Sequence, residues 1–390
     1  MPDTTDVIII GAGIHGASLA FHLTELGARV LVLERRFIAA GATGRSNGLV
    51  RMYYDLESDA RLAWLSFPYF REWADRVGGH CGYVRTGFLQ LMPPNQAQPL
   101  RDRVAAQQAM GIPTLLVTAD DVRRLAPALN ADDFEVAAFE PESGYADPAA
   151  TAQGFMAAAQ RKGARLIQDC EVNTIQVVGD RVIGVGSNCG RWLAPVIVNA
   201  AGPWAPQVAS LVGLELPVRV LRHDVAVLRR PPALGATHPT VIDEINQMHF
   251  RPEGRTLTLV GLDDVNVLDE SPDGSTDHSR PGHVDRVAER ICRRIPAMDE
   301  GSLQSAYCGF EGISVDSRPI LDWAGPSGFC LVCGFSGTGF KTAPAVGRAM
   351  AELIVAGRST DVDLSPYRWG RFAGGALERM LASAAAYQVV

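Results

Sequence analysis

The sequence lacks any apolar run long enough to cross a lipid bilayer, which takes roughly 18 to 20 residues. Its start also lacks a basic segment followed by an apolar one, so we expect no secretory leader and a cytoplasmic location. Basic runs interleaved with aromatic residues are absent as well, and the net charge is −7. These absences predict a small-molecule partner, with neither a membrane nor a nucleic acid involved.

Patterns typical of metal and thiol sites are missing too. No cysteine and histidine cluster has the spacing of metal ligands, so we expect no metal. The seven cysteines are odd in number and widely spread, which favours reduced thiols. Cys330 and Cys333 form a C-x-x-C pattern, but they fall in an apolar strand pattern that turns them to opposite faces. We therefore interpret this pair as buried and structural.

Lysine is scarce, and catalytic amino-acid patterns are absent. Only Lys162 and Lys341 are lysines among the 36 basic residues, so a lysine within a motif stands out. No Ser/His/Asp or paired-carboxylate signature occurs, which is consistent with chemistry carried by a cofactor. The composition, 47% hydrophobic and 20% charged over 390 residues, is that of a globular protein with two or three domain-sized units.

A glycine motif near the start is the most informative feature that is present. Gly11, Gly13 and Gly16 follow the apolar run 7–10, and a helix of about a dozen residues is expected next. A second apolar strand then ends in Glu34, whose carboxylate can accept hydrogen bonds from a ribose. This spacing predicts a dinucleotide-binding βαβ unit with the phosphates at the helix N-terminus. The motif alone leaves FAD and NAD open.

Later segments alternate between two predicted domains. Elements predicted for the nucleotide-binding domain are a helix over 148–161, strands over 163–167, 196–199 and 329–333, a hairpin around 182–185, and a helix over about 343–356. Antiparallel strands are predicted over 225–229, 249–251 and 256–260, with a turn at 252–254. We predict a nucleotide-binding domain from residues 1–63, 146–215 and 315–390, and a substrate domain from 64–145 and 216–314. A cleft between them is the expected ligand site.

Five stretches in this order resemble the flavin amine oxidase family that includes glycine oxidase, D-amino acid oxidase, sarcosine oxidase and dimethylglycine dehydrogenase. They are residues 11–16, 41–51, 144–148, 198–204 and 334–341, and the resemblance covers nearly the whole chain. It implies an α/β fold in which a Rossmann-like FAD-binding domain interleaves with an antiparallel-sheet substrate domain. It also implies FAD rather than NAD.

The resemblance assigns most cofactor contacts to the quoted stretches. Val172 would hold the adenine through its backbone, the stretch 41–48 would pass the pyrophosphate or the flavin ring, and 337–341 would contact that ring. The residues implied for FAD binding are Gly11, Gly13, Ile14, His15, Gly16, Glu34, Arg35, Ala42, Thr43, Arg45, Ser46, Asn47, Gly48, Leu49, Val172, Gly202, Trp204, Gly337, Thr338, Gly339, Phe340 and Lys341.

Two cations match family positions that bind the substrate carboxylate. Arg51 can grip a carboxylate with two parallel hydrogen bonds, and Lys341 can add a point charge. Together they would fix the α-carbon near the flavin. The alternatives are an Arg51 exposed to solvent and a Lys341 that contacts only flavin oxygens.

Three positions depart from the family pattern. Glu311 stands where glycine oxidase has a carboxylate-binding arginine, and we expect it to contact the substrate amine or a polar tail, or to form a structural salt bridge. Gly309 stands where monomeric sarcosine oxidase attaches its flavin, so we expect noncovalent FAD, with Cys308 a small buried residue. The lysine that the sarcosine oxidase branch places over the flavin is absent, and Leu259 lies near its place. That absence weakens the expectation of an oxidase.

The resulting hypothesis is an enzyme that oxidises the C–N bond of an amino acid or N-substituted glycine. Hydride passes to the flavin, water hydrolyses the imine, and O2 or another acceptor takes the electrons, with H2O2 as the product from O2. The alternatives are a flavin dehydrogenase for a 2-hydroxy acid, an amine dehydrogenase with a non-oxygen acceptor, and a nonenzymatic FAD-binding subunit. His223, His249 and Tyr145 are candidate pocket residues, or ordinary core and surface side chains.

Overall fold

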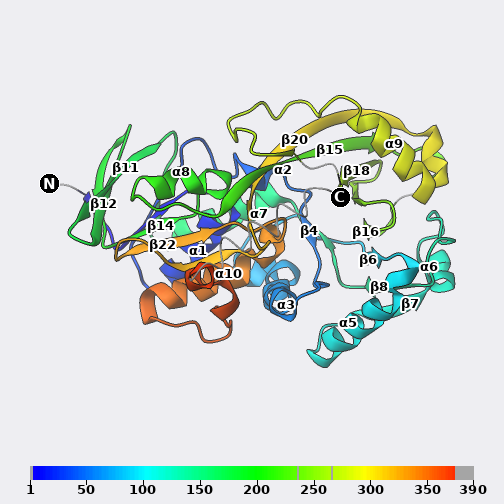
Figure 1. Cartoon of the computed structure of the whole chain (residues 1–390), viewed down its shortest axis with the longest axis horizontal. Coiled ribbons are helices and arrows are strands. Elements are labelled where there is room, and N and C mark those ends of the chain that lie inside the picture. The colour runs from blue at the N-terminus through cyan, green and yellow to red at the C-terminus, as the bar shows by residue number, and fades with distance from the viewer. Residues whose placement is uncertain (1–2, 235–236, 265–266, 374–390) are drawn as a thin grey trace.

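The computed structural model describes residues 3–234, 237–264 and 267–373. The predicted domain segments therefore extend, at residues 1–2, 235–236, 265–266 and 374–390, outside the described residues. Elements of the nucleotide-binding part gather at one end of an elongated molecule, and the largest sheet lies at the other (Figure 1). The predicted residue boundaries of the two domains stay a prediction.

A six-stranded sheet forms the centre of the nucleotide-binding part. Its first five strands run parallel, and the last pairs antiparallel at one edge. In spatial order the strands are β10 (Arg165–Ile167), β3 (Val30–Leu33), β2 (Val7–Ile10), β14 (Val196–Asn199), β22 (Phe329–Cys333) and β21 (Ile320–Trp323). The strands predicted over 7–10, 196–199 and 329–333 are confirmed, and the one predicted over 163–167 begins two residues later, at Arg165.

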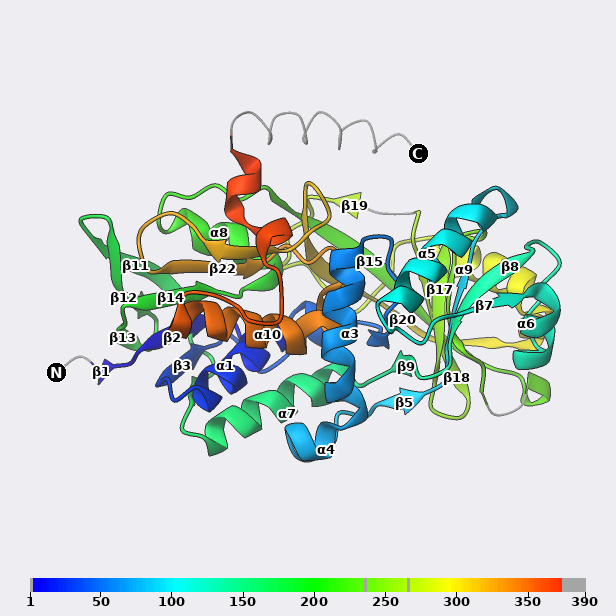
Figure 2. The same cartoon turned by 90° about the horizontal axis from the view of Figure 1, so that it is seen from below.

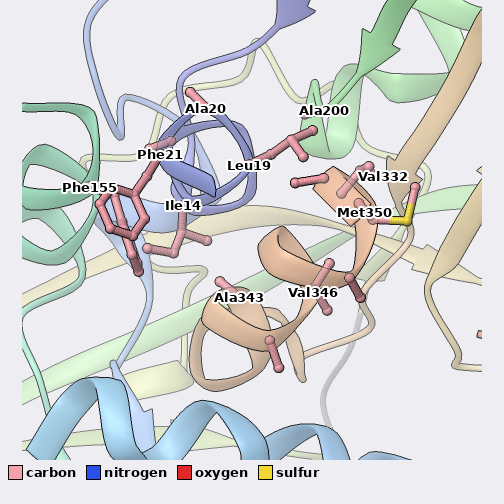
Figure 3. Packing of buried hydrophobic residues seen from close by; sticks show 14 of the residues in the cluster. Ile14, Leu19, Ala20, Phe21, Phe155, Ala200, Val332, Ala343, Val346 and Met350 are labelled. Carbon is pink, nitrogen blue, oxygen red and sulfur yellow. The ribbon is translucent and has the colours of Figure 1, made fainter. Parts of the chain in front are cut away.

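Both faces of this sheet are buried, which explains why its strands read as continuous apolar runs. Successive side chains of a strand point to opposite faces, so Val7 and Ile9 join one hydrophobic cluster while Ile8 and Ile10 join another. Helices α1 (Ile14–Glu25), α7 (Pro148–Arg161) and α10 (Gly339–Ala356) cover the first face (Figure 2). Figure 3 shows Ile14, Leu19 and Phe21 of α1 packed among these helices.

The opposite face is covered by α8 (Ala205–Ser210) and a smaller sheet. That sheet contains the predicted hairpin, since β11 and β12 pair antiparallel on either side of a turn at 179–180. Its strands in order are β1 (Asp3–Thr4), β13 (Gly190–Leu193), β12 (Arg181–Ser187) and β11 (Val172–Val178). The predicted α7 is confirmed at its bounds, and it begins with Asp147 accepting a hydrogen bond from the backbone N–H of Ala150.

The last helix begins earlier than predicted. We expected its start near Ala343, but α10 begins at Gly339 and contains Pro344. The first turn is stabilised by side chains, because the Thr342 hydroxyl donates to the carbonyl of Thr338 at 3.0 Å. Phe340 also packs against Phe70 with 5.5 Å between ring centroids, which buries this turn. The predicted end at Gly357 is confirmed.

A nine-stranded sheet brings both predicted substrate segments together. Its strands are β19 (Val267–Leu268), β15 (Val218–Arg229), β18 (Leu257–Leu262), β17 (Met248–Glu253), β16 (Thr240–Asp243), β6 (Phe88–Leu91), β8 (Val136–Glu140), β7 (Leu115–Thr118) and, paired along β15, β20 (Ser302–Ser314). Its pairs are antiparallel except that β16 runs parallel to β6. The β16–β6 pair is where the chain segments 64–145 and 216–314 join.

The predicted turn at 252–254 is two residues too early. β17 continues through Pro252 to Glu253, and the turn spans residues 254–256. Proline lacks a backbone N–H, so it is tolerated in a strand where one edge is unpaired. Pro252 meets this condition, because β16 pairs with β17 only as far as Phe250 while β18 pairs opposite Pro252 itself.

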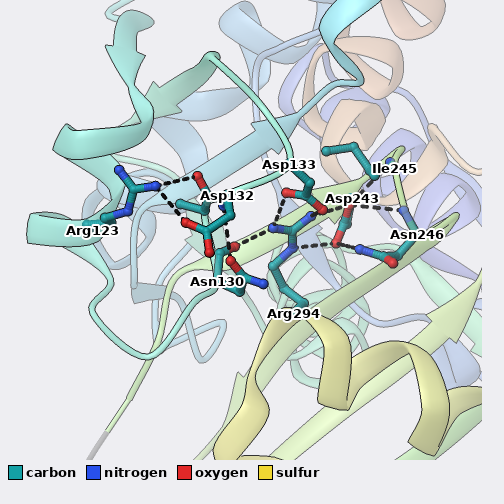
Figure 4. A network of polar contacts seen from close by, with 9 residues as sticks. Arg123, Asn130, Asp132, Asp133, Asp243, Ile245, Asn246 and Arg294 are labelled. Carbon is teal, nitrogen blue, oxygen red and sulfur yellow. Dashed lines mark hydrogen bonds and ion pairs between the residues drawn. The ribbon is translucent and has the colours of Figure 1, made fainter.

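Helices on the substrate part are held by charge as well as by apolar packing. Arg294 of α9 (His283–Arg294) is 1% exposed and donates to Asp243 at 2.7 Å and to Asp133 at 2.8 Å (Figure 4). Asp243 also accepts from the backbone N–H groups of Ile245 and Asn246, which fixes the turn after β16. The other helices here are α5 (Ala97–Ala109), α6 (Ala119–Leu125), η1 (Pro94–Gln96), η3 (Pro232–Leu234) and η4 (Pro296–Glu300).

Short elements connect the two parts. A three-stranded sheet joins β4 (Leu49–Val50), β9 (Gly144–Tyr145) and β5 (Val84–Arg85), and α3 (Glu57–Arg71) packs against α10 while crossing the predicted 63/64 boundary. The remaining elements are α2 (Ala42–Arg45), α4 (Trp73–Arg76), η2 (Gly202–Trp204), η5 (Ser365–Tyr367) and η6 (Trp369–Phe372). No helix among the described residues has the length and apolarity that a bilayer-spanning segment requires.

Candidate active site

One large cavity, of about 740 Å³, runs between the two parts of the molecule. Its nucleotide end is lined by the turn after β2, by Glu34 and by Val172. Its other end is lined by Arg51, Lys341 and residues of the nine-stranded sheet. The cavity therefore follows the expected cleft.

Two glycines shape the nucleotide end through close backbone contacts. Gly11 has φ +106°, and a Cβ added to it would lie 2.6 Å from the carbonyl oxygen of Ala200. A Cβ on Gly16 would lie 2.0 Å from the carbonyl oxygen of Gly11, so Gly16 lets α1 press against the turn. Gly16 supports the turn from behind and is not among the cavity-lining residues. Only glycine fits at either position without a backbone shift.

Glu34 ties together the loops around the nucleotide end. Its Oε2 accepts from the backbone N–H of Ala12 at 2.8 Å, and its Oε1 accepts from that of Arg36 at 2.9 Å. The side chain is 9% exposed and lines the cavity. Each carboxylate oxygen has a second lone pair, so Glu34 can hold the loop and still accept from a ribose hydroxyl.

The N-terminus of α1 opens into the middle of the cavity. Gly13, Ile14 and His15 line the cavity wall, and Thr43 Oγ1 accepts from the backbone N–H of Ile14 at 3.0 Å. The segment that carries Thr43 contains the single helical turn α2. The positive end of α1 therefore faces the cavity at the place where a pyrophosphate is expected.

A cluster at the cavity margin joins the two parts of the molecule. The guanidinium of Arg35 lies 4.1 Å from the ring centroid of Trp204, and both residues bind Asp273. Trp204 Nε1 donates to Asp273 Oδ1 at 3.0 Å, and Arg35 forms an ion pair with the same oxygen. Asp273 follows β19 in the substrate part, whereas Arg35 and Trp204 belong to the nucleotide-binding part.

His15 lies in an apolar environment between the two ends. Its ring stacks on Phe335 with centroids 3.5 Å apart, and neither ring nitrogen has a hydrogen-bond partner among the described residues. Burial lowers the pKa of His15 to about 3. His15 is therefore neutral near pH 7.

Arg51 and Lys341 both line the cavity, and both lie close to the ring of Tyr54. The Arg51 guanidinium lies 4.1 Å from the centroid of the Tyr54 ring, and Lys341 Nζ lies 5.6 Å from it. Among the described residues, no carboxylate forms an ion pair with either cation, and the buried Nε of Arg51 has no partner. Burial, and then the charge of Arg51, hold the pKa of Lys341 well below its usual range. An arriving anion would favour the charged form of both groups.

Glu311 and Lys341 hold the same peptide turn. Glu311 Oε2 accepts from the backbone N–H of Gly337 at 2.8 Å, and Lys341 Nζ donates to the carbonyl of Gly337 at 3.1 Å. Burial raises the pKa of Glu311. No ion pair to Glu311 is found in the described part of the chain, so the predicted structural salt bridge is replaced by a bond to backbone.

A histidine–aspartate pair lines the substrate side. His249 Nδ1 lies 2.8 Å from Asp263 Oδ1, and its Nε2 lies 2.6 Å from Asn47 Nδ2. Since Asp263 accepts the Nδ1 proton, Nε2 carries the lone pair and accepts from the Asn47 amide. His223 stacks on His249 with centroids 5.1 Å apart, and burial lowers its pKa to about 4. His223 is therefore neutral near pH 7.

The cavity brings together nearly all the residues predicted from the sequence. The predicted residues on its wall are Gly11, Gly13, Ile14, His15, Glu34, Arg35, Ala42, Thr43, Arg45, Ser46, Asn47, Gly48, Leu49, Arg51, Val172, Gly202, Trp204, Glu311, Gly337, Thr338, Gly339, Phe340 and Lys341. His223 and His249 also line it, whereas Tyr145 lies outside the lining under the guanidinium of Arg251, 4.2 Å from it.

Sequence reasoning missed Glu244 and Asp263 on the substrate side and Asp273 at the nucleotide side. Each comes after a strand of the nine-stranded sheet, but only β18 among these strands was predicted, so a position after a strand could have signalled Asp263 alone. Gly309, which the resemblance aligned with a flavin-attachment position, has no side chain, and a Cβ added to it would lie 2.8 Å from Arg45 Cβ. Cys308 is fully buried and Leu259 is 6% exposed, and both lie outside the cavity lining.

Comparison with known proteins places these residues in a family context. The sequence model of the family described as FAD dependent oxidoreductase matches residues 6–353. Mitochondrial sarcosine dehydrogenase of Homo sapiens is 28% identical over 386 residues, covering 95% of this chain and 42% of that protein. This chain thus spans less than half the length of that relative. Sarcosine oxidase subunit beta of Rhizobium meliloti is also 28% identical, covering 95% of this chain and 89% of that subunit.

Solved structures show the same fold. L-proline dehydrogenase from P. horikoshii superposes with a TM-score of 0.89 at 24% identity, covering 95% of this chain and 98% of that one. Glycine oxidase from Geobacillus kaustophilus gives a TM-score of 0.83 at 22% identity, with coverages of 95% and 100%. The predicted Rossmann-like α/β fold with an interleaved substrate sheet is confirmed.

Proposed function

We propose that this protein oxidises the C–N bond of an N-substituted amino acid. The chain belongs to the FAD dependent oxidoreductase family, so it is an enzyme that uses FAD. The observation that carries this proposal is the pair of cavity-lining cations, Arg51 and Lys341, that both lie close to the Tyr54 ring. Relatives named for sarcosine and dimethylglycine support a secondary or tertiary amino acid as substrate.

The residues present fit an FAD molecule along the cavity. Glu34 would hold the ribose and the N-terminus of α1 would face the phosphates, while the Gly337 turn, to which Lys341 donates, would lie beside the flavin. Both ring nitrogens of His15 are buried without partners in the middle of this path, so a bound group can satisfy them. Noncovalent attachment fits the glycine at position 309, where the Arg45 side chain leaves no room for a cysteine.

When bound, FAD supplies a two-electron acceptor that takes a hydride from a substrate carbon. The chain's own residues orient the substrate for this step. Arg51 donates two hydrogen bonds to the substrate carboxylate and Lys341 adds a third, which fixes the α-carbon. The neutral substrate amine loses hydride from an adjacent carbon and becomes an iminium cation. Water then converts the iminium cation to a carbonyl compound and an amine, with release of one proton. O2 is the expected final acceptor, with H2O2 as its product.

A second candidate is oxidation of a 2-hydroxy acid, which also needs a carboxylate clamp. The observation that favours it is the His249–Asp263 pair on the cavity wall, because a histidine with a lone pair on Nε2 can act as a general base. Asn47 donates to that same nitrogen at 2.6 Å, so the base must first lose this bond. We rank this candidate second for that reason.

Anaerobic reduction of the purified holoenzyme tests the proposal. Sarcosine, N-alkylglycines, proline, glycine, D-alanine and 2-hydroxy acids would be mixed with the protein, and loss of the flavin absorbance recorded. We expect the fastest bleaching with a secondary amino acid. Fastest bleaching by D-alanine or by a 2-hydroxy acid would refute the proposal, and subsequent admission of air would show whether O2 restores the absorbance.

A further inference from the structure

The carboxylate of Glu244 lines the cavity without a cationic partner. It lies in the turn between β16 and β17, and its backbone N–H donates to the carbonyl of Leu91 at 3.0 Å. The amide groups of Gln90 and Gln247 approach its two oxygens only to 3.5 Å, which is the outer limit of a hydrogen bond. No ion pair to Glu244 is found within residues 3–234, 237–264 and 267–373.

Carboxyl groups outnumber cations at this end of the cavity. Glu244, Asp263 and Glu311 face it together with the cations Arg51 and Lys341. Asp263 is bound to His249, and Glu311 accepts from the backbone of Gly337. If a substrate carboxylate occupies the two cations, as in the proposed function, Glu244 is left as an acceptor for a further positive group. Mutual repulsion among the three acids makes the site unfavourable for a second anion.

Asn47 is a further residue of the same cavity with an unsatisfied polar atom. Its side chain is 8% exposed and lines the same cavity, and its Nδ2 is used by His249. Its Oδ1 has no hydrogen-bond partner among the described residues. Buried carbonyl oxygens are normally satisfied, so a ligand N–H in this region would supply the missing donor.

We propose that the preferred substrate carries a second ammonium group, on its N-substituent or side chain, which binds the carboxylate of Glu244. This inference rests on the proposed function for the position of the substrate carboxylate. It specifies the substrate class as diamino acids, and it predicts that the enzyme discriminates against dicarboxylic amino acids.

Binding of simple acids to the holoenzyme tests the inference separately from turnover. The probes are alkanoates of four to six carbons, the ω-amino acids of the same lengths, and the matching dicarboxylates, titrated anaerobically while the flavin absorbance spectrum is followed. We expect the best ω-amino acid to bind about tenfold more tightly than its alkanoate, as one charge-assisted hydrogen bond allows, and the dicarboxylate to bind more weakly than both.

Two variants locate the effect. Glu244→Gln should reduce the preference for the ω-amino acid to about twofold or less while leaving alkanoate affinity near that of the wild type. The exposed Glu215→Gln is the matched control and should keep the full preference. Persistence of the preference in Glu244→Gln would overturn the assignment to Glu244.

The failure of this inference is distinguishable from failure of the proposed function. If alkanoates bind and Arg51→Ala weakens them, but the ω-amino acids gain nothing, the carboxylate clamp stands and the inference is overturned. If alkanoate binding is absent or insensitive to Arg51→Ala, the proposed function fails, and the inference is overturned with it.

Discussion

The two ends of the cavity differ in how completely their polar groups are satisfied. At the nucleotide end, both oxygens of Glu34 accept backbone N–H groups, and Thr43 accepts that of Ile14. At the substrate end, Arg51 Nε and Asn47 Oδ1 are buried without partners among the described residues. The polar groups named at the nucleotide end are therefore hydrogen-bonded within the protein, whereas those named at the substrate end can still bond to a ligand.

The ends also differ in how the chain builds them. The turn after β2, helix α1 and Glu34 come from one continuous stretch, whereas the substrate end collects residues from both sheets and from α10. A contiguous scaffold can be shared among enzymes that use one cofactor. In a site assembled from distant segments, substitutions in one strand can alter the substrate specificity and leave the other segments unchanged.

The largest expected effect is on the nucleotide end, through Gly16→Ala. The new Cβ would lie 2.0 Å from the carbonyl oxygen of Gly11, so α1 must move away from the turn. We expect FAD affinity to fall by roughly a hundredfold, measured by titrating apoprotein with FAD, with a lower Tm. Gly370→Ala, where no atom lies within 4 Å of the added Cβ, is the control. Normal FAD binding by Gly16→Ala would remove the structural basis of this comparison.

The next effect is on the substrate end, through Arg51→Ala. Truncation leaves the substrate carboxylate without its main partner, so kcat/KM for the best amino acid should fall by roughly 30-fold, or about 2 kcal/mol. FAD absorbance should stay unchanged. The control is Arg85→Ala, which removes an exposed ion pair with Glu142. An unaltered KM and kcat/KM would eliminate the clamp.

A smaller effect concerns pH and Lys341. Since burial lowers its pKa, Lys341 loses its proton as pH rises through values below the usual lysine range, and carboxylate binding should weaken there. Arg51 and Glu311 are the charged groups that act on it. In the wild type, alkanoate affinity measured from pH 6 to 10 should fall as Lys341 loses its proton. In Lys341→Met this fall should be absent. Lys162→Met, the other lysine and 45% exposed, should retain the wild-type profile.

The smallest effect returns to the nucleotide end, through Asp273→Asn. The change removes the ion pair to Arg35 but keeps an acceptor for Trp204 Nε1. Because the pair is partly exposed, we expect FAD to dissociate only about two- to fivefold faster, by stopped-flow fluorescence, with less difference at high salt. Exposed Asp277→Asn should match the wild type. A salt-independent change would contradict an ionic origin.

More of the nucleotide-binding part than of the substrate part could be predicted from the sequence. The strands β2, β3, β14 and β22 were recognisable because burial on both faces requires continuous apolar runs, and the glycine spacing predicted the turn between β2 and α1. Errors arose where packing overrides local signals, as in the early start of α10 and the late turn after β17. The pairing of β16 with β6 joins residues about 150 positions apart, and no local pattern encodes it.

The sequence by itself determined much of the cofactor scaffold, since Gly16 and Glu34 act on neighbours in one βαβ unit whose geometry is local. It also singled out Lys341 as one of only two lysines. Only the tertiary structure decided that Arg51 and Lys341 share the Tyr54 ring, that Glu311 holds a backbone turn, and that Glu244 and Asp263 face them. The charges that line a cavity depend on which distant segments of the chain lie there. Hydrophobic burial of the two sheets brings these segments together.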